Sequence, residues 1–81
     1  MTHLTKDERL LITIYQLAKP TGDVHATVNR YQAGDLIGLH PKAVDTICKL
    51  LLQANFIKKG TLDDVYITPN GLKLIEQLLK Q

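Results

Sequence analysis

The sequence predicts a single α+β domain spanning residues 1–81, with three core helices, a β-hairpin and a C-terminal helix. Three observations carry this prediction. Apolar residues recur at helical spacing near both ends of the chain. A Gly-Leu-His-Pro turn at residues 38–41 separates two further helical segments. Two short strand-like runs, at residues 56–59 and 65–68, flank a turn-rich tip, which is the pattern of a hairpin.

The composition is that of an ordinary soluble globular protein, with 44% hydrophobic and 22% charged residues. A net charge of +2 is compatible with a polyanionic partner but does not require one. The single cysteine cannot form an internal disulfide, which favours a reducing compartment. The polar N-terminus is no signal peptide, and no apolar run approaches the about 20 residues of a membrane span. We therefore expect a cytoplasmic protein that does not associate with membranes.

The first helix begins after Thr5, which forms a capping box with Glu8. It ends at the Pro-Thr-Gly sequence of residues 20–22. Helical periodicity places one apolar face toward the core, formed by Leu10, Leu11, Ile14, Leu17 and Ala18. Ile12 falls outside this stripe, so we expect it on the outer side of the helix.

The segment 23–31 alternates apolar and polar residues, which suggests a short strand or coil, although a helix start near Asn29 or Arg30 fits equally. A brief second helix over Tyr31–Ile37 is expected to follow and to close at Gly38. Its inward residues are expected to be Ala33, Leu36 and Ile37.

The third helix begins at Pro41, a favoured first helical residue, with His40 as its N-cap. It runs to about Ala54, and Asn55 supplies a left-handed stop. Its inward face comprises Val44, Ile47, Cys48 and Leu51. We accordingly expect Cys48 to be a small core residue rather than a reactive thiol.

The hairpin consists of strands Phe56–Lys59 and Val65–Thr68 around the tip Gly60–Asp64. Thr68 caps the last helix, which begins at Pro69.

The last helix carries two apolar stripes. Leu72, Ile75 and Leu79 share one face, and Leu74 and Leu78 lie roughly opposite. A small domain exposes some leucines in any case, but a second stripe also suits a homodimer. We favour the homodimer, with an interface formed by Ile12, Leu74 and Leu78.

Enzymatic chemistry finds little support in the sequence. The three histidines are far apart and have no metal-ligand spacing, and the five glycines form no phosphate-binding loop. The adjacent Asp63 and Asp64 fall at the hairpin tip, where solvent covers them. We expect no catalysis, no metal and no cofactor.

The second and third helices have the order of a helix-turn-helix, whose second helix enters the DNA major groove with its N-terminal residues. Lys42 could donate to guanine or phosphate, Ala43 and Thr46 offer methyl groups to thymine, and Asp45 could accept from cytosine. The full set of candidate DNA contacts is Arg30, His40, Lys42, Ala43, Asp45, Thr46, Lys49, Lys58 and Lys59.

The charges around these residues cancel in the sequence. The charges of Lys42 and Lys49 are balanced by those of Asp35 and Asp45. In the hairpin, the two lysines at 58 and 59 are balanced by the two aspartates at 63 and 64. A single copy therefore makes few phosphate contacts, which supply most of the affinity for DNA. The same lysines also suit the solvated face of a protein-interaction adaptor, so this alternative stays open.

Residues 34–44 and 51–59 resemble the winged helix-turn-helix domain of bacterial transcription regulators. The sequence Val-Tyr-Ile-Thr-Pro-Asn-Gly at 65–71 resembles the exit from the wing in MarR-like and PadR-like regulators. The resemblance implies a two- or three-stranded wing and a recognition helix at 41–54. It implies sequence-specific binding of double-stranded DNA by a small transcription regulator. Winged helices also serve as protein-interaction modules, which is the alternative function.

Overall fold

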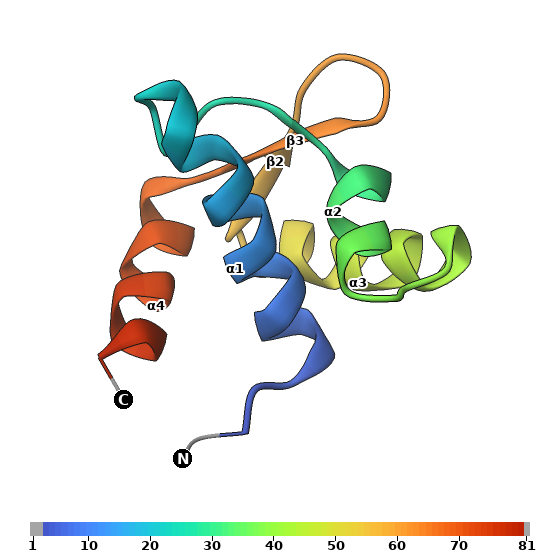
Figure 1. Cartoon of the computed structure of the whole chain (residues 1–81), viewed down its shortest axis with the longest axis horizontal. Helices are drawn as coiled ribbons and strands as arrows, with labels where there is room; N and C mark the ends of the chain where they lie inside the picture. Colours follow the sequence, from blue (N-terminus) through green and yellow to red (C-terminus); the bar gives the residue numbers. More distant parts are fainter. Residues whose placement is uncertain (1–2, 81) are drawn as a thin grey trace.

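The computed structural model describes residues 3–80, and these residues form an α+β domain with four α-helices and a three-stranded antiparallel sheet (Figure 1). The elements in chain order are α1 (Lys6–Ala18), the 3₁₀ turn η1 (Lys19–Thr21), β1 (Val28–Asn29), α2 (Arg30–Leu36), α3 (Pro41–Gln53), β2 (Ile57–Lys59), β3 (Asp64–Ile67) and α4 (Pro69–Leu79).

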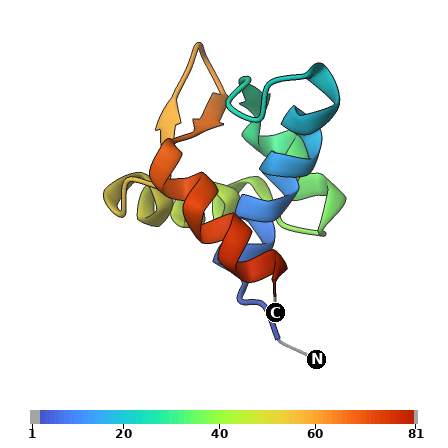
Figure 2. The same cartoon turned by 90° about the vertical axis from the view of Figure 1, so that its left-hand side faces the viewer.

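Helix α1 occupies the centre of the domain. It packs against α2 and α3 on one side and against α4 on the other (Figures 1 and 2). The sheet has the order β1-β3-β2, so β3 is its middle strand. Val65 of β3 pairs with Val28 of β1 and with Lys59 of β2. This pairing ties the hairpin to the segment that precedes α2.

Local sequence signals fix the ends of the helices as expected. Thr5 and Glu8 form the capping box, with Thr5 N donating to Glu8 Oε1 at 2.9 Å. Gly38 and Asn55 both have positive φ, at 73° and 64°, where α2 and α3 end. The Thr68 hydroxyl accepts from Gly71 N at 3.0 Å and donates to the Asn55 carbonyl at 2.6 Å. Thr68 therefore joins the start of α4 to the end of α3.

The core contains the apolar residues expected on α1 and α3, together with one side of the sheet. Its largest fully buried side chains are Leu10, Leu11, Ile14, Ile57, Ile67, Ile75, Val44 and Val65. Cys48 is buried among them, as predicted. Among residues 3–80, no helix combines the length and the apolar character that a membrane crossing requires.

The predicted outer position of Ile12 is wrong. Its side chain is only 8% exposed and belongs to the core, because α4 covers the side of α1 that the sequence left open. Leu74 and Leu78 are likewise partly buried against the core, whereas Leu79, expected inward, is 54% exposed. Residues of both apolar stripes of α4 therefore pack against the core of the same chain.

The predicted inward position of Leu36 is also wrong, since this residue is 64% exposed. Helix α2 approaches α3 at Gly34, where a Cβ would overlap the Val44 side chain. Leu36 lies two residues, and thus about 200°, around the helix from Gly34, so it points away from α3. The helix itself is shifted by one residue from the predicted range and starts at Arg30.

Candidate nucleic-acid interface

Helix α3 has one face in the core and the opposite face in solvent. Val44, Ile47, Cys48 and Leu51 are buried. The exposed face carries Asp45 and a row of four further polar residues at helical spacing, which we name the α3 ridge: Lys42, Thr46, Lys49 and Gln53. The helix therefore presents a narrow polar strip with two lysines one heptad apart.

The N-terminal end of the ridge is open to contacts. His40, the N-cap, makes no side-chain capping bond, and its ring is exposed. The Thr46 hydroxyl donates back to the Lys42 carbonyl at 3.1 Å, which leaves its methyl group for outward contacts. Ala43 is half-buried beside the ridge. These four predicted residues are brought together on one end of α3.

Arg30 and Asp45, two further predicted contacts, bind each other, although the Asp45 side chain stays 54% exposed. Arg30 Nε donates to Asp45 Oδ1 at 3.4 Å, and Arg30 Nη2 donates to the Tyr31 hydroxyl at 2.9 Å. The Tyr31 hydroxyl in turn donates to Asp45 Oδ1 at 2.6 Å. The Arg30 guanidinium also lies over the Tyr31 ring, 4.5 Å from its centroid. The Arg30 side chain is only 17% exposed as a result.

Arg30 also contacts the hairpin tip. Its backbone N–H donates to the Asp63 carbonyl at 3.1 Å, and Nη2 lies 3.6 Å from Asp63 Oδ1. Arg30 therefore joins α2, α3 and the tip at one point. Its role is to position these elements, and it does not present a free guanidinium to a partner.

The electrostatics of this cluster follow from its hydrogen bonds. The bond from Tyr31 and the neighbouring Arg30 guanidinium hold the pKa of Asp45 below its ordinary value. The bond to Asp45 raises the pKa of the Tyr31 hydroxyl. Asp45 thus stays ionised but is compensated by Arg30, so it opposes the charge of the α3 ridge less than the sequence suggested. The sequence does not predict a role for Tyr31, because nothing in it indicates that its hydroxyl meets Asp45.

The two hairpin lysines lie on opposite faces of β2, because side chains alternate along a strand. Lys59 pairs with Val65 in the register and lines the space between the hairpin and α3. Lys58 pairs with Tyr66 and lies on the outer face with Asn70 and Pro69 of α4. Of the two lysines, only Lys59 lies on the same side of the molecule as Lys49.

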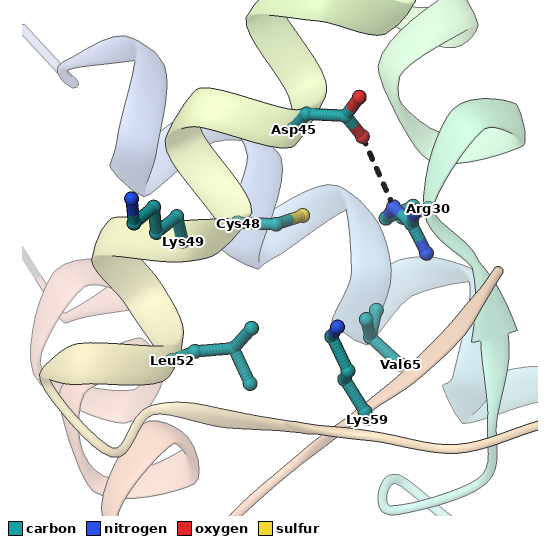
Figure 3. Close-up of a pocket in the computed structure, with 7 residues that line it drawn as sticks. All are labelled: Arg30, Asp45, Cys48, Lys49, Leu52, Lys59 and Val65. Carbon is teal, nitrogen blue, oxygen red and sulfur yellow. Dashed lines mark hydrogen bonds and ion pairs between the residues drawn. The ribbon is translucent and has the colours of Figure 1, made fainter.

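A cavity of about 350 Å³ separates α3 from the hairpin (Figure 3). Arg30 and Lys59 contribute cationic groups to its lining, Lys49 lies at its rim, and Cys48, Leu52 and Val65 contribute apolar surface. Burial raises the pKa of the Cys48 thiol to about 11, so this wall is neutral at physiological pH. No sequence pattern predicts this cavity, because it depends on how the hairpin folds back toward α3.

A second, apolar groove of about 390 Å³ lies at the other side of α3, between α1 and α4. Leu50, which is 49% exposed, forms part of its wall together with Leu11, Phe56 and Leu74. Asp7 and Glu8 of the first turn of α1 lie at its rim. The groove thus brings Leu74, a predicted interface residue, together with the exposed Leu50 of α3.

Comparisons of the chain with protein-family models, with curated proteins and with solved structures give no match. Among residues 3–80, His, Cys, Asp and Glu side chains form no group of three or more that could hold a metal ion.

Proposed function

We propose that this protein is a small transcription regulator that binds double-stranded DNA with helix α3 in the major groove. The observation that carries the proposal is the α3 ridge, in which Lys42 and Lys49 are exposed while Asp45 is compensated by Arg30. The element order and the three-stranded antiparallel sheet are compatible with a winged-helix arrangement, in which β2–β3 is the wing. Such a regulator acts in the cytoplasm.

The major groove admits one α-helix, and the residues near the N-terminus of that helix reach the base edges. On α3 these residues are Lys42, Ala43 and Thr46, with His40 at the cap. Lys42 donates to guanine or to a phosphate, and the methyl groups of Ala43 and Thr46 contact thymine. Lys49, two turns further along, is placed for a phosphate. Arg30 and Asp45 act by positioning α3 against the hairpin and make no base contact in this proposal.

The hairpin contributes one phosphate contact, from Lys59, on the same side as Lys49. Lys58 faces the other way and contributes none. Few cations therefore reach the DNA from one copy, and since each phosphate contact adds to affinity, we propose that two copies bind together. Pairing through α4 is supported by the exposure of Leu79 and the partial exposure of Leu74 and Leu78. Ile12 plays no part, because it is buried.

A protein-interaction adaptor is the second candidate, and the apolar groove beside Leu50 and Leu74 favours it. Its apolar wall and acidic rim suit a protein segment that carries apolar and basic residues. In that case the α3 ridge is a solvated surface, and replacing its lysines leaves the partner bound.

The experiment measures fluorescence anisotropy of a short labelled duplex at low salt. Lys42→Gln with Lys49→Gln removes two charges from the α3 ridge, and the matched control Lys6→Gln with Lys19→Gln removes two exposed lysines from α1 and η1. We expect the ridge variant to lower affinity at least about tenfold and to reduce the salt dependence by about two phosphate contacts. Equal losses in both variants would show a nonspecific charge effect and contradict the proposal.

A further inference from the structure

The cavity between α3 and the hairpin has the size and lining of a small-molecule site. Its volume of about 350 Å³ lies within the range of ligand pockets, and its walls mix apolar surface with a few polar groups. Figure 3 shows Leu52 and Lys59 extending into this space from opposite sides, with the Cys48 sulfur facing Arg30 across it. Lys49 stands at the rim, with its ammonium group directed outward.

The charges in the lining are unbalanced. Among residues 3–80, Asp45 is the one carboxylate of the lining, and it already accepts from Arg30 and Tyr31. Both ion pairs within residues 3–80 involve Arg30, so Lys49 and Lys59 are left without an acidic partner in the described chain. Lys59 in the cavity and Lys49 at its rim, together with the apolar wall, favour a ligand with two negative charges and an apolar body.

We propose that this cavity binds a small phosphate monoester. The phosphoryl group, which carries about −1.5 to −2 charges near neutral pH, would be held by Lys59 and by Lys49 after rotation of its exposed side chain. The organic part would contact Leu52 and Val65. A single carboxylate would leave one ammonium group unmatched, and inorganic phosphate would leave the apolar walls without a contact.

Occupation of the cavity also regulates the proposed function, and this part of the inference rests on that function. Lys49 and Lys59 are the same residues that are proposed to contact DNA phosphates, so a bound ester competes with DNA for them. Because the coupling between two ligands is reciprocal, the ester lowers the affinity for duplex, and duplex lowers the affinity for the ester.

The test titrates the isotope-labelled protein with phenyl phosphate and follows backbone amide shifts by NMR. We expect saturable shifts at Cys48, Lys49, Lys59 and Val65, and binding that is at least about tenfold weaker for inorganic phosphate and for benzyl alcohol. Lys59→Gln should weaken binding of phenyl phosphate about tenfold, since it removes a charge-assisted hydrogen bond. The matched control is Lys58→Gln, one residue away on the opposite face of β2, which should leave the affinity unchanged.

The site is refuted if phenyl phosphate and inorganic phosphate bind equally, if Lys58→Gln is as damaging as Lys59→Gln, or if the shifts scatter over the surface. Circular dichroism of both variants verifies that each is folded. The regulatory part is measured separately, as loss of duplex affinity with added phenyl phosphate. If the protein binds the ester but no duplex, the proposed function fails while the ligand site stands.

Discussion

The hydroxyl of Tyr31 donates a 2.6 Å hydrogen bond to Asp45 Oδ1 and so links the first turn of α2 to the exposed half of α3. Arg30 completes the link with its own bond to the same carboxylate oxygen. Helices α2 and α3 are thereby held together at the surface, next to the α3 ridge.

This bond predicts a pH dependence of stability. The pKa of Asp45 is lowered in the folded protein, so the bond stabilises the fold above the ordinary pKa of 3.8. The contribution disappears as the pH falls below that value and the carboxylate takes up a proton. We expect the melting temperature of the wild-type protein to fall more steeply than that of Asp45→Asn as the pH is lowered below this value. If the melting temperatures of the two proteins change equally with pH, the role assigned to Asp45 is wrong.

Arg30→Gln should reduce stability modestly and loosen the hairpin tip. It removes the side-chain contacts to Asp45 and Asp63, both partly exposed, and exposed ion pairs of this kind contribute little to stability. Urea unfolding measures the loss, and amide hydrogen exchange of Asp64, which donates to the Thr61 carbonyl, reports on the tip. Arg9→Gln, an exposed arginine of α1, is the control and should change neither quantity.

Gly71→Ala should be strongly destabilising. A Cβ at this buried position in the first turn of α4 would overlap the carbonyl oxygen of Phe56, which already accepts from Thr68 N at 3.0 Å. The backbone must shift, at a cost of about 1–3 kcal/mol in the free energy of unfolding. Asn70→Ala, at the exposed neighbouring position, should cost far less in the same urea titration. Equal effects would mean that α4 does not approach the Phe56 carbonyl as closely as described.

Cys48 should resist alkylation in the folded protein. Its thiol is buried and its pKa is raised to about 11, so little thiolate forms at about pH 8. Because the pKa is raised, the neutral thiol favours the fold below the ordinary pKa, and that contribution disappears as the pH rises through about 11. Iodoacetamide labelling followed by mass spectrometry should be slow in buffer and fast in urea. Rapid labelling of the folded chain would refute the buried position.

The sequence predicted the elements of this fold well because their ends depend on neighbouring residues. The capping box at Thr5, the positive φ of Gly38 and Asn55, and the cap at Thr68 are local interactions. Helical periodicity also placed the core residues of α3 correctly, since that helix has 13 residues and a single buried face.

The errors arise where a residue's surroundings come from distant parts of the chain. Ile12 is buried because α4 packs on the second side of α1, and Leu36 is exposed because Gly34 sets the rotation of α2. The same reason explains the candidate site. No spacing in the sequence indicates that Arg30 bonds to Asp45, fifteen residues away. Nor does it indicate that Lys59 lines the cavity beside α3 while Lys58 lies on the other side of β2.

The most direct test of DNA binding by α3 is an NMR titration of the isotope-labelled protein with a short duplex at low salt. The proposal predicts that the largest amide shift changes fall on residues 41–49 and on Lys59, and that added salt reverses them. Changes confined to the groove formed by Leu11, Leu50 and Leu74, or no changes at low salt, would contradict it.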